Sequence, residues 1–134
     1  MAPATQAPGV ETRLTDHGAW PDISGERVVW RQSGPEGKLV MLLNLSTGER
    51  SVLANGHRFG DRAVISGTRV AWHDTDSQDA AAANITVADL STGTLTELRT
   101  EANQAFPALL EDRVLWEDRF VGQAAIDIVL FEFR

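Results

Sequence analysis

Three histidines are the side chains in this chain best suited to acid–base chemistry or metal binding, because imidazole titrates near neutral pH and commonly ligates metals. They are His17, His57 and His73. Their spacing matches neither His-x-His nor His-Glu-x-x-His, the patterns that bring two imidazoles onto one metal ion. We therefore expect these histidines to form hydrogen bonds at the surface, with no metal and no cofactor.

An acidic run at residues 74–79 has carboxylates of the kind that bind Ca²⁺. A calcium loop beginning at Asp74 needs Gly at its sixth position and Glu at its twelfth, where this chain has Asp79 and Ile85. The run is therefore predicted to be a solvated hairpin loop. No serine lies in a Gly-x-Ser-x-Gly motif, and no Gly-rich phosphate loop is present. The sequence assigns no catalytic residue.

A repeat positions these side chains. Arg-Val-Val-Trp at residues 27–30 returns as Arg-Val-Ala-Trp at 69–72 and as Arg-Val-Leu-Trp at 113–116, so the tryptophans are 42 and 44 residues apart. A second signature, Asn-Leu-Ser-Thr-Gly at 44–48, returns as Asp-Leu-Ser-Thr-Gly at 89–93. Asn or Asp, Ser and Gly supply side-chain-to-backbone hydrogen bonds and positive φ, which predict a tight turn between strands.

Apolar and alternating segments around these signatures predict four short strands, a to d, in each repeat. In the first repeat, strand a covers residues 21–23, strand b 27–30, strand c 39–45 and strand d 49–53. Four-stranded units of about 40 to 50 residues are the blades of a β-propeller. The predicted fold class is therefore all-β, a β-propeller with three four-stranded blades per chain.

The blades are predicted to divide the chain as follows. Residues 1–8 form a flexible Ala/Pro leader without the basic and apolar regions of a signal peptide; a mature exported chain with an added methionine and an ordinary cytoplasmic start are both open. The propeller half occupies residues 9–134. It comprises strand d of a split blade at 9–15, complete blades at 19–54 and 61–100, and strands a to c of the split blade at 105–134.

Strand d of the split blade is predicted from the spacing of Gly9 and Leu14, which matches that of Gly48 and Leu53. Three blades do not close a ring, since propellers contain about four to eight. A half-ring leaves open edges, which promote association. We therefore predict a homodimer in which the N-terminal strand of each copy completes the last blade of the other and closes a six-bladed ring. The rival explanation is a fragment whose other blades were removed.

The residues at 23–30, Ile-Ser-Gly-Glu-Arg-Val-Val-Trp, and the turn at 44–48 resemble the repeat of TolB-like six-bladed propellers. Those repeats commonly show Pro-x-Ile-Ser-Gly-x-Arg-Val-Val-Trp followed by Asp-Leu-Ser-Thr-Gly. The resemblance covers nearly the whole chain from Gly9 onward. It implies the fold and, because many members are parts of periplasmic or cell-surface proteins, a periplasmic or extracellular location. This chain has half the blades of the family pattern, so an activity borne by a neighbouring domain is not carried over.

The loops joining strand b to c and strand d to a are longer and more varied than the other turns, and they share one end of a propeller. Binding residues are often on variable loops of a rigid scaffold. Trp20 stands out there because the other repeats have no tryptophan at its position. The candidate binding residues at this end are His17, Trp20, Arg31, His57, Asp61, Arg62, His73, Gln104 and Glu117.

Residues that recur inside strand b are predicted to be structural. The tryptophans are expected to fill the wedge between adjacent blades, and the arginines to make contacts next to the a–b turn. These residues are Trp30, Trp72 and Trp116, and Arg27, Arg69 and Arg113.

The composition restricts the partners. Of the 134 residues 43% are hydrophobic and 23% are charged, a balance typical of globular domains, and the net charge is −7. The absence of a Lys/Arg cluster argues against binding to nucleic acid or an anionic membrane surface. No apolar run approaches the length of a membrane-spanning helix. With no cysteine, the chain has no disulfide and no thiolate site.

The leading functional interpretation is a non-catalytic binding or scaffold module that self-assembles into a closed ring and takes a protein or glycan ligand. One alternative is a small propeller hydrolase or lyase, in which Asp22, Asp61 and His57 would converge at the central channel. The other is a half-propeller, engineered or evolutionary, without a ligand.

Overall fold

The computed structural model describes residues 8–34, 37–54, 58–76, 83–98, 103–119 and 126–134. Within these residues the chain forms strands and turns, and no helix. The strands are β1 (Gly18–Ser24), β2 (Arg27–Gly34), β3 (Gly37–Asn44), β4 (Arg50–Ala54), β5 (Arg58–Ser66), β6 (Arg69–Asp76), β7 (Ala83–Asp89), β8 (Thr94–Leu98), β9 (Asn103–Leu110), β10 (Arg113–Arg119) and β11 (Ile126–Glu132).

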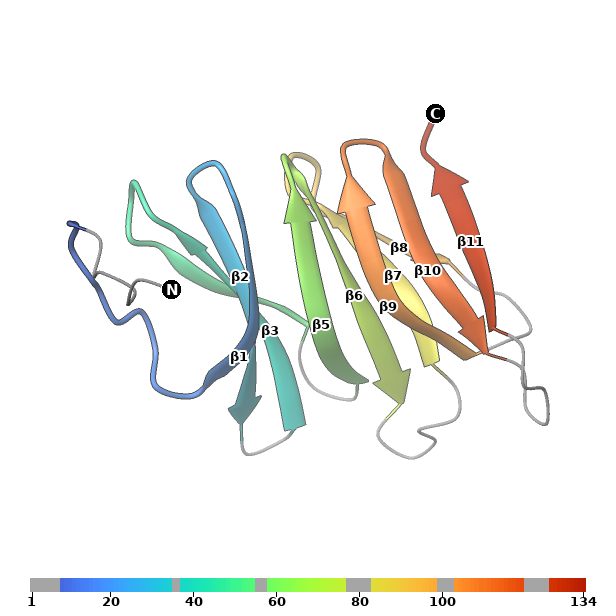
Figure 1. Ribbon diagram of the computed structural model, residues 1–134, viewed down its shortest axis with the longest axis horizontal. Coiled ribbons are helices and arrows are strands. Elements are labelled where there is room, and N and C mark those ends of the chain that lie inside the picture. The colour runs from blue at the N-terminus through green and yellow to red at the C-terminus, as the bar shows by residue number, and fades with distance from the viewer. Residues whose placement is uncertain (1–7, 35–36, 55–57, 77–82, 99–102, 120–125) are drawn as a thin grey trace, which may run out of the picture.

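These strands form three antiparallel sheets that stand side by side as blades (Figure 1). The first sheet has the order β1-β2-β3-β4, the second β5-β6-β7-β8, and the third β9-β10-β11. Within each sheet, each strand pairs with the next along the chain, because antiparallel neighbours can be joined by short connections. The prediction of an all-β chain built from three repeated sheets is confirmed, with three strands in the described part of the third sheet.

The Ser-Thr-Gly signatures form the predicted turns between the third and fourth strands of a sheet. Asn44 Oδ1 accepts hydrogen bonds from the backbone N–H and the hydroxyl of Ser46 at 2.9 and 2.7 Å. Asp89 accepts the same pair from Ser91 at 2.9 and 2.6 Å. Gly48 and Gly93 both have φ of 76°, a left-handed conformation that glycine adopts without steric cost. The recurrence of these residues thus fixes the turn before the fourth strand in the first two sheets.

The core lies between neighbouring blades. The first two sheets enclose a buried cluster that contains Val29 and Trp72, and the second and third enclose another that contains Ala71 and Trp116. In both interfaces the tryptophan face of one blade packs on the opposite face of the blade before it. The prediction that the recurring tryptophans fill the wedge between blades is confirmed for these two interfaces.

Polar contacts next to the a–b turns also join neighbouring blades. Arg27 Nη1 donates to the carbonyl of Gly67 at 3.4 Å, and Arg69 Nη1 donates to the carbonyl of Glu111 at 3.1 Å. The backbone N–H of Gly67 donates to Ser24 Oγ at 3.0 Å, and that of Glu111 donates to the corresponding serine, Ser66, at 2.8 Å. The predicted structural role of these two arginines is therefore confirmed.

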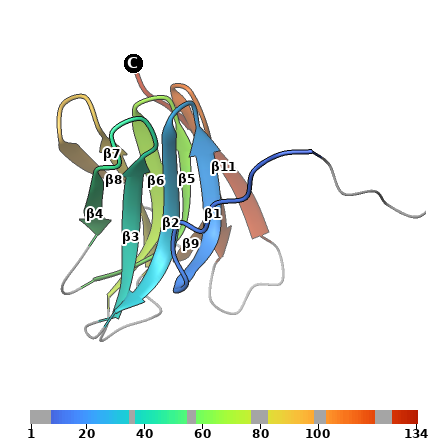
Figure 2. The same cartoon turned by 90° about the vertical axis from the view of Figure 1, so that its left-hand side faces the viewer.

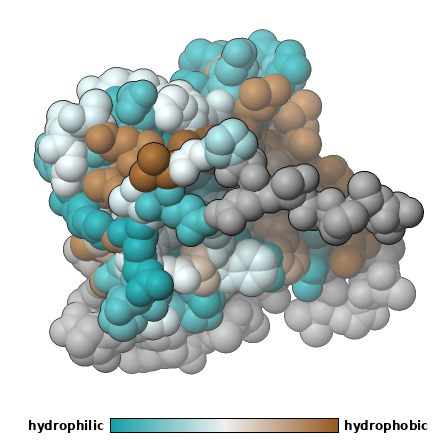
Figure 3. Space-filling model, turned by 60° about the vertical axis from the view of Figure 1, so that its left-hand side comes forward, coloured by the Kyte–Doolittle hydropathy of each residue, from teal (hydrophilic) through white to brown (hydrophobic). Residues whose placement is uncertain are grey.

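Both outer blades have a face that no other blade of the chain covers. On the third sheet this face exposes apolar side chains, among them Leu115, Ile128 and Leu130, the last two 68% and 51% exposed. On the first sheet the face around Trp30 is covered in part by Leu14. Figure 3, in which the side of the first sheet is turned forward, shows apolar surface in brown.

Residues 8–17 form no strand within one chain. Leu14 packs on the cluster around Trp30, and its carbonyl accepts a hydrogen bond from Arg50. The residues before Leu14 extend away from the sheets (Figure 2). The predicted strand at residues 9–15 requires a second copy as its partner, so it stays a prediction.

Candidate functional site

The first strand of each sheet, namely β1, β5 or β9, has a β-bulge at the same place in the repeat. The pairing register shifts between Ala19 and Asp22 in the first sheet and between Asp61 and Val64 in the second, and it shifts likewise in the third. The residue inside each bulge has a left-handed backbone: φ is 53° at Trp20, 51° at Arg62 and 54° at Phe106. A bulge re-aims a side chain, so these three residues occupy one special position of the repeat.

The bulges have a local cause in two of the blades. Trp20 and Phe106 each precede a proline, Pro21 and Pro107. Proline lacks an N–H to donate to the ladder and is confined in sheets to edges and bulges. A non-glycine residue with positive φ costs about 1–3 kcal/mol, and such residues cluster at functional sites. The same unfavourable backbone conformation recurs in all three blades, which makes this repeat position a candidate functional site.

The bulge residues stack on one another across the blades. The Arg62 Cζ lies 3.7 Å from the centroid of the Trp20 ring and 4.2 Å from that of Phe106. Arg119 Cζ lies 4.8 Å from the same phenyl centroid. These four residues are called the arginine–aromatic stack below. Cation–π contacts of this kind contribute about 0.5–2 kcal/mol each, more where water is excluded, and they hold the guanidinium groups in place.

A cavity of about 200 Å³ lies beside the stack. Most of its walls are apolar, and the guanidinium of Arg62 is the charged group among them. Its lining residues are Trp20, Pro21, Arg62, Ala63, Val64, Phe106 and Pro107. Among the described residues, the cavity is thus lined by Arg62 and otherwise by apolar side chains, a common composition for small ligand sites.

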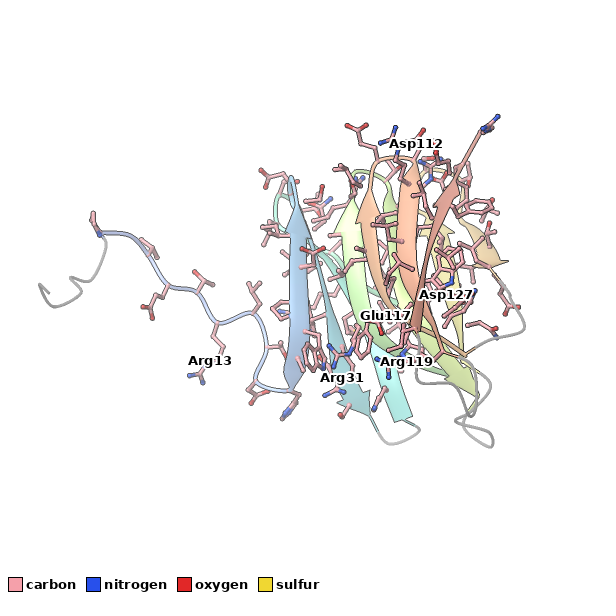
Figure 4. All side chains as sticks on the ribbon, turned by 45° about the vertical axis from the view of Figure 1, so that its right-hand side comes forward. Arg13, Arg31, Asp112, Glu117, Arg119 and Asp127 are labelled. Carbon is pink, nitrogen blue, oxygen red and sulfur yellow. The ribbon has the colours of Figure 1, made fainter. Side chains whose placement is uncertain are left out.

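Three of the predicted site residues occupy one further repeat position, directly after the buried tryptophan of the second strand. They are Arg31, His73 and Glu117, and all three are partly buried. Glu117 Oε1 accepts hydrogen bonds from Arg119 Nη2 and Nε at 2.8 and 3.1 Å, which connects this position to the arginine–aromatic stack. Figure 4 shows Arg31, Glu117 and Arg119 toward the same end of the blades, with Asp112 at the opposite end.

Gln104, also predicted at the site, has a structural role. Its side chain is fully buried, and Oε1 accepts a hydrogen bond from the backbone N–H of Ile85 at 2.7 Å. This bond ties β9 to β7 of the neighbouring blade. The indole N–H groups of two tryptophans also have side-chain acceptors two residues further along the chain. That of Trp30 donates to Gln32 at 3.2 Å, and that of Trp116 donates to Asp118 at 2.7 Å.

Two of the three histidines, His17 and His73, lie within the described residues. His17 is exposed and lies 3.1 Å from the carboxylate of Asp16. His57 lies outside the described residues, and the side chain of Asp61 lies outside them as well. Within the described part of the chain, no group of three potential ligands could hold a metal ion. Asp22, considered above for catalysis, accepts backbone N–H groups of Ile23 and Ile65 at 2.9 Å each.

The predicted location of the site residues on loops is wrong for seven of them. The strands extend further than the apolar runs suggest, because ladder hydrogen bonds use the backbone and tolerate polar side chains at strand ends. The residues that lie in strands are Trp20, Arg31, Asp61, Arg62, His73, Gln104 and Glu117.

Sequence reasoning missed Phe106 and Arg119 as members of the site. The sequence marks Trp20 because no other repeat has tryptophan at its position, and residue identity alone does not connect Trp20 to the residues at the same place in the other repeats. Aligning Trp20 with Arg62 and Phe106 gives an alternation of aromatic and cationic side chains at one repeat position. Stacking chemistry across that position was the signal that could have found the site.

No helix in the described part of the chain is long and apolar enough to cross a membrane. No protein-family model matches the chain, and no curated protein matches it.

Solved structures are similar to this one. A putative TolB from Agrobacterium tumefaciens matches with a TM-score of 0.69 at 13% identity, over 88% of this chain and 47% of that one. TolB from Acinetobacter baumannii matches at 0.66 and 14%, over 90% of this chain and 31% of that one. The β-propeller domain of the Trilobed protease from Pyrococcus furiosus matches at 0.66 and 18%, over 87% and 38%.

These similarities identify the fold as a TolB-like β-propeller, as the repeat predicted. The chain spans less than half the length of each of these three structures. At identities this low the likeness concerns the fold alone.

Proposed function

We propose that this chain is a propeller module that pairs with a second copy of itself to close a six-bladed ring. The ring would present a ligand-binding face at the end that contains the arginine–aromatic stack. The observation that carries this proposal is the position of Leu14. It packs on the cluster around Trp30, as Leu53 packs on the cluster around Trp72.

In the proposed ring, Leu14 would take the place of an outer-strand leucine from a preceding blade. Leu98 of β8 belongs in the same way to the cluster around Trp116. Within one chain, Leu14 has no sheet around it, and a cavity of about 310 Å³ remains between its segment and the face around Trp30. A third sheet from a second copy would supply the missing sheet and fill this space.

The exposed face of the third sheet matches that requirement. Leu115 stands at the repeat position of Val29 and Ala71, which are buried against the tryptophan face of the next blade. Leu115 is 41% exposed instead. Seating this face on the partner's Trp30 would reproduce the two interfaces that already exist within the chain, and two-fold symmetry makes both new contacts identical.

The free edge of β11 supports the same arrangement. The first two sheets have four strands each, whereas β11 is the outermost described strand of the third. An unpaired edge exposes N–H and C=O groups that can accept another strand. Residues 9–15 of the partner would pair there and complete the blade.

The test is the solution mass measured by light scattering after size-exclusion chromatography. We expect about twice the 14.6 kDa of one chain. Leu115→Glu should give a folded monomer, because a carboxylate would be buried in the new interface. Leu95→Glu is the matched control: Leu95 is exposed on β8, away from both open faces, and its variant should remain dimeric.

Removal of residues 1–15 tests the strand exchange separately. It should also abolish the dimer, because the last blade would lose its fourth strand. A folded wild-type chain that stays monomeric at high concentration would contradict ring closure, and so would a Leu115→Glu variant that dimerises like the wild type.

A further inference from the structure

We infer that two copies of this chain recognise each other through one register of strand pairing, in which Arg13 of one copy lies beside the partner's Asp127. The inference rests on the strand exchange proposed above, and it adds the residues that select the partner. Two-fold symmetry would form this ion pair twice in each ring. Such a pair favours a second copy of the chain over a strand with other charges.

The alignment of β11 with the third strands of the other two sheets follows from the recurring tryptophans. Each tryptophan has one residue directly opposite it on the third strand of its sheet. These pairs are Trp30 with Met41, Trp72 with Thr86, and Trp116 with Val129. Met41, Thr86 and Val129 therefore occupy equivalent positions, so β11 aligns with β3 and β7.

The register of the fourth strand is the same in both complete sheets at two successive positions. Ser51 lies opposite Leu42 and Val52 opposite Met41 in the first sheet; Thr96 lies opposite Val87 and Glu97 opposite Thr86 in the second. Counted from the turn glycines at 48 and 93, these are the third and fourth residues. Counted from Gly9, the third and fourth residues are Thr12 and Arg13. The same register on β11 places Thr12 opposite the partner's Leu130 and Arg13 opposite the partner's Val129.

The side chains at the first of these positions agree with the register. Ser51 and Thr96 each place a hydroxyl-bearing side chain opposite an aliphatic residue, as Thr12 would do opposite the partner's Leu130. Thr12 and Leu14 lie on one face of an extended strand, because side chains alternate. A shift by one residue would turn Leu14 away from the face around Trp30, where it packs within its own chain.

The second position would carry the recognition. The residue two places before Met41, Thr86 or Val129 lies diagonally across from it, within reach of a long side chain. The diagonal pairs are Val52 with Leu39 in the first sheet, Glu97 with Asn84 in the second, and Arg13 with the partner's Asp127 in the ring. The first pair is apolar, the second polar, and the third joins a cation to an anion. The chemistry of the two members thus matches in every blade.

A single chain keeps Arg13 and Asp127 apart. Arg13 lies beside the first sheet, ahead of Leu14, whereas Asp127 is on β11 in the third sheet; Figure 4 shows both. Both side chains are exposed, and in the described part of the chain neither has an ion-pair partner. Exposed ion pairs add little affinity, so the expected contribution is mainly to the choice of partner.

Exchange of the two charges tests the pair in the full-length chain. Arg13→Glu would place like charges together at both contacts of the ring, and so would Asp127→Arg. We expect each change to raise the dissociation constant of the dimer at least about fivefold, measured by sedimentation equilibrium. The chain with both changes should return to within about twofold of the wild type, because the pair is restored with its charges reversed. This chain also keeps the net charge of the wild type, which separates the pair from a general effect of charge.

A mixture of the wild type with the doubly changed chain gives a sharper measurement. Each chain alone has matched contacts, whereas a mixed dimer would have like charges at both contacts. Random pairing of equal amounts gives about half mixed dimers, and we expect clearly fewer by native mass spectrometry. A mixture at the random proportion would overturn the recognition by Arg13 and Asp127.

Cysteine pairing checks the register without changing any charge. The chain has no cysteine, so Thr12→Cys combined with Leu130→Cys gives a disulfide that can form only between the two introduced positions. Directly opposite residues lie within the distance that a disulfide spans. We expect a covalent dimer on mild oxidation. Thr12→Cys combined with Ile128→Cys is the matched control, because Ile128 lies on the same face two residues away, and this pair should stay largely unlinked.

The outcomes separate the register from ring closure. A wild-type dimer that is linked through Ile128 in place of Leu130, or through neither, would overturn the register and leave ring closure standing. Charge exchange that fails to restore the dimer in a chain folded by circular dichroism would overturn the ion pair in the same way. A wild-type chain that stays monomeric at high concentration would overturn both the proposed function and this inference.

Discussion

At the scale of single residues, comparison of the three blades shows where the backbone geometry is kept while the residue type changes. The a–b turn has Gly25 in the first blade and Gly67 in the second, with φ of 55° and 57°. The third blade has Glu111 at the same place, with φ of 56°. The turn geometry is therefore kept while the residue best suited to it is lost.

Replacing Glu111 by Gly should stabilise the fold. A non-glycine residue in the left-handed region costs about 1–2 kcal/mol, and the extra chain entropy of glycine offsets about 0.5–1 kcal/mol of that. We expect a net gain of up to about 1 kcal/mol in the free energy of unfolding, measured by urea denaturation. Gly67→Ala is the reciprocal control and should lose stability, although nothing surrounds its missing Cβ. A destabilised Glu111→Gly variant would contradict the argument.

Asp89 should make the second Ser-Thr-Gly turn sensitive to acid. Hydrogen bonds from the hydroxyl and then the backbone N–H of Ser91 lower the pKa of Asp89, and the charge of Arg69 adds to the effect. Because the pKa is lower in the folded state, this stabilisation is present above the unfolded pKa and is lost as pH falls through the folded pKa.

Asp89→Asn should therefore flatten the acid side of the stability profile, since Asn44 makes the same turn without a titrating group. The measurement compares urea midpoints of both chains from near-neutral pH down to about pH 3, below the ordinary pKa of aspartate. Parallel profiles would show that the turn carboxylate contributes nothing to acid sensitivity.

At the scale of strands and sheets, the sequence predicted the order of elements well and their lengths less well. The recurring Arg-Val-x-Trp and Ser-Thr-Gly motifs combine apolar side chains with turn residues, and both are local signals. The bulges were not predicted, because they depend on pairing between strands. The candidate site lies at those bulges, so its position on strands required the structure, whereas the shared repeat position of Trp20, Arg62 and Phe106 can be read from the sequence.

Ser66 offers a test of how the sheets are joined. Its hydroxyl accepts a hydrogen bond from the backbone N–H of Glu111 in the next blade at 2.8 Å. Ser66→Ala should lower the free energy of unfolding by roughly 0.5–1.5 kcal/mol, the usual net contribution of such a bond. Ser51→Ala, at an exposed position of β4, should change it little. Urea denaturation of both variants measures the difference; equal losses would mean that the contact between blades is not the cause.

At the scale of the whole molecule, the two open faces differ from the internal interfaces at one polar position. Ser24 and Ser66 accept hydrogen bonds from the following blade, whereas the third blade has Leu110 at this place, 68% exposed. Arg113 stands where Arg27 and Arg69 donate across the interface. In the proposed ring, Arg113 would donate to the partner's Gly25.

Arg113→Met should therefore weaken the dimer while leaving the monomer folded. We expect the dissociation constant to rise about tenfold, or about 1.4 kcal/mol, a loss that is typical for a hydrogen bond from a charged group. Sedimentation equilibrium over a range of concentrations gives the constant. Within one chain Arg113 is 3.8 Å from Glu132 on the exposed surface, so Glu132→Gln separates loss of that pair from loss of the new contact. An unchanged dissociation constant for Arg113→Met would count against the proposed seating.

The open faces of the first and third sheets have a consequence for how longer propellers can arise. Each chain has one open face with Leu115 and Leu130 and one with Trp30, and in the proposed ring the first face of one copy would pack on the second face of the other. Joining two copies in tandem through a short peptide would seat the same surfaces in a single polypeptide. If the proposed ring forms, gene duplication followed by fusion would need no new contact surface, because the joint between the copies would resemble the two interfaces inside each chain.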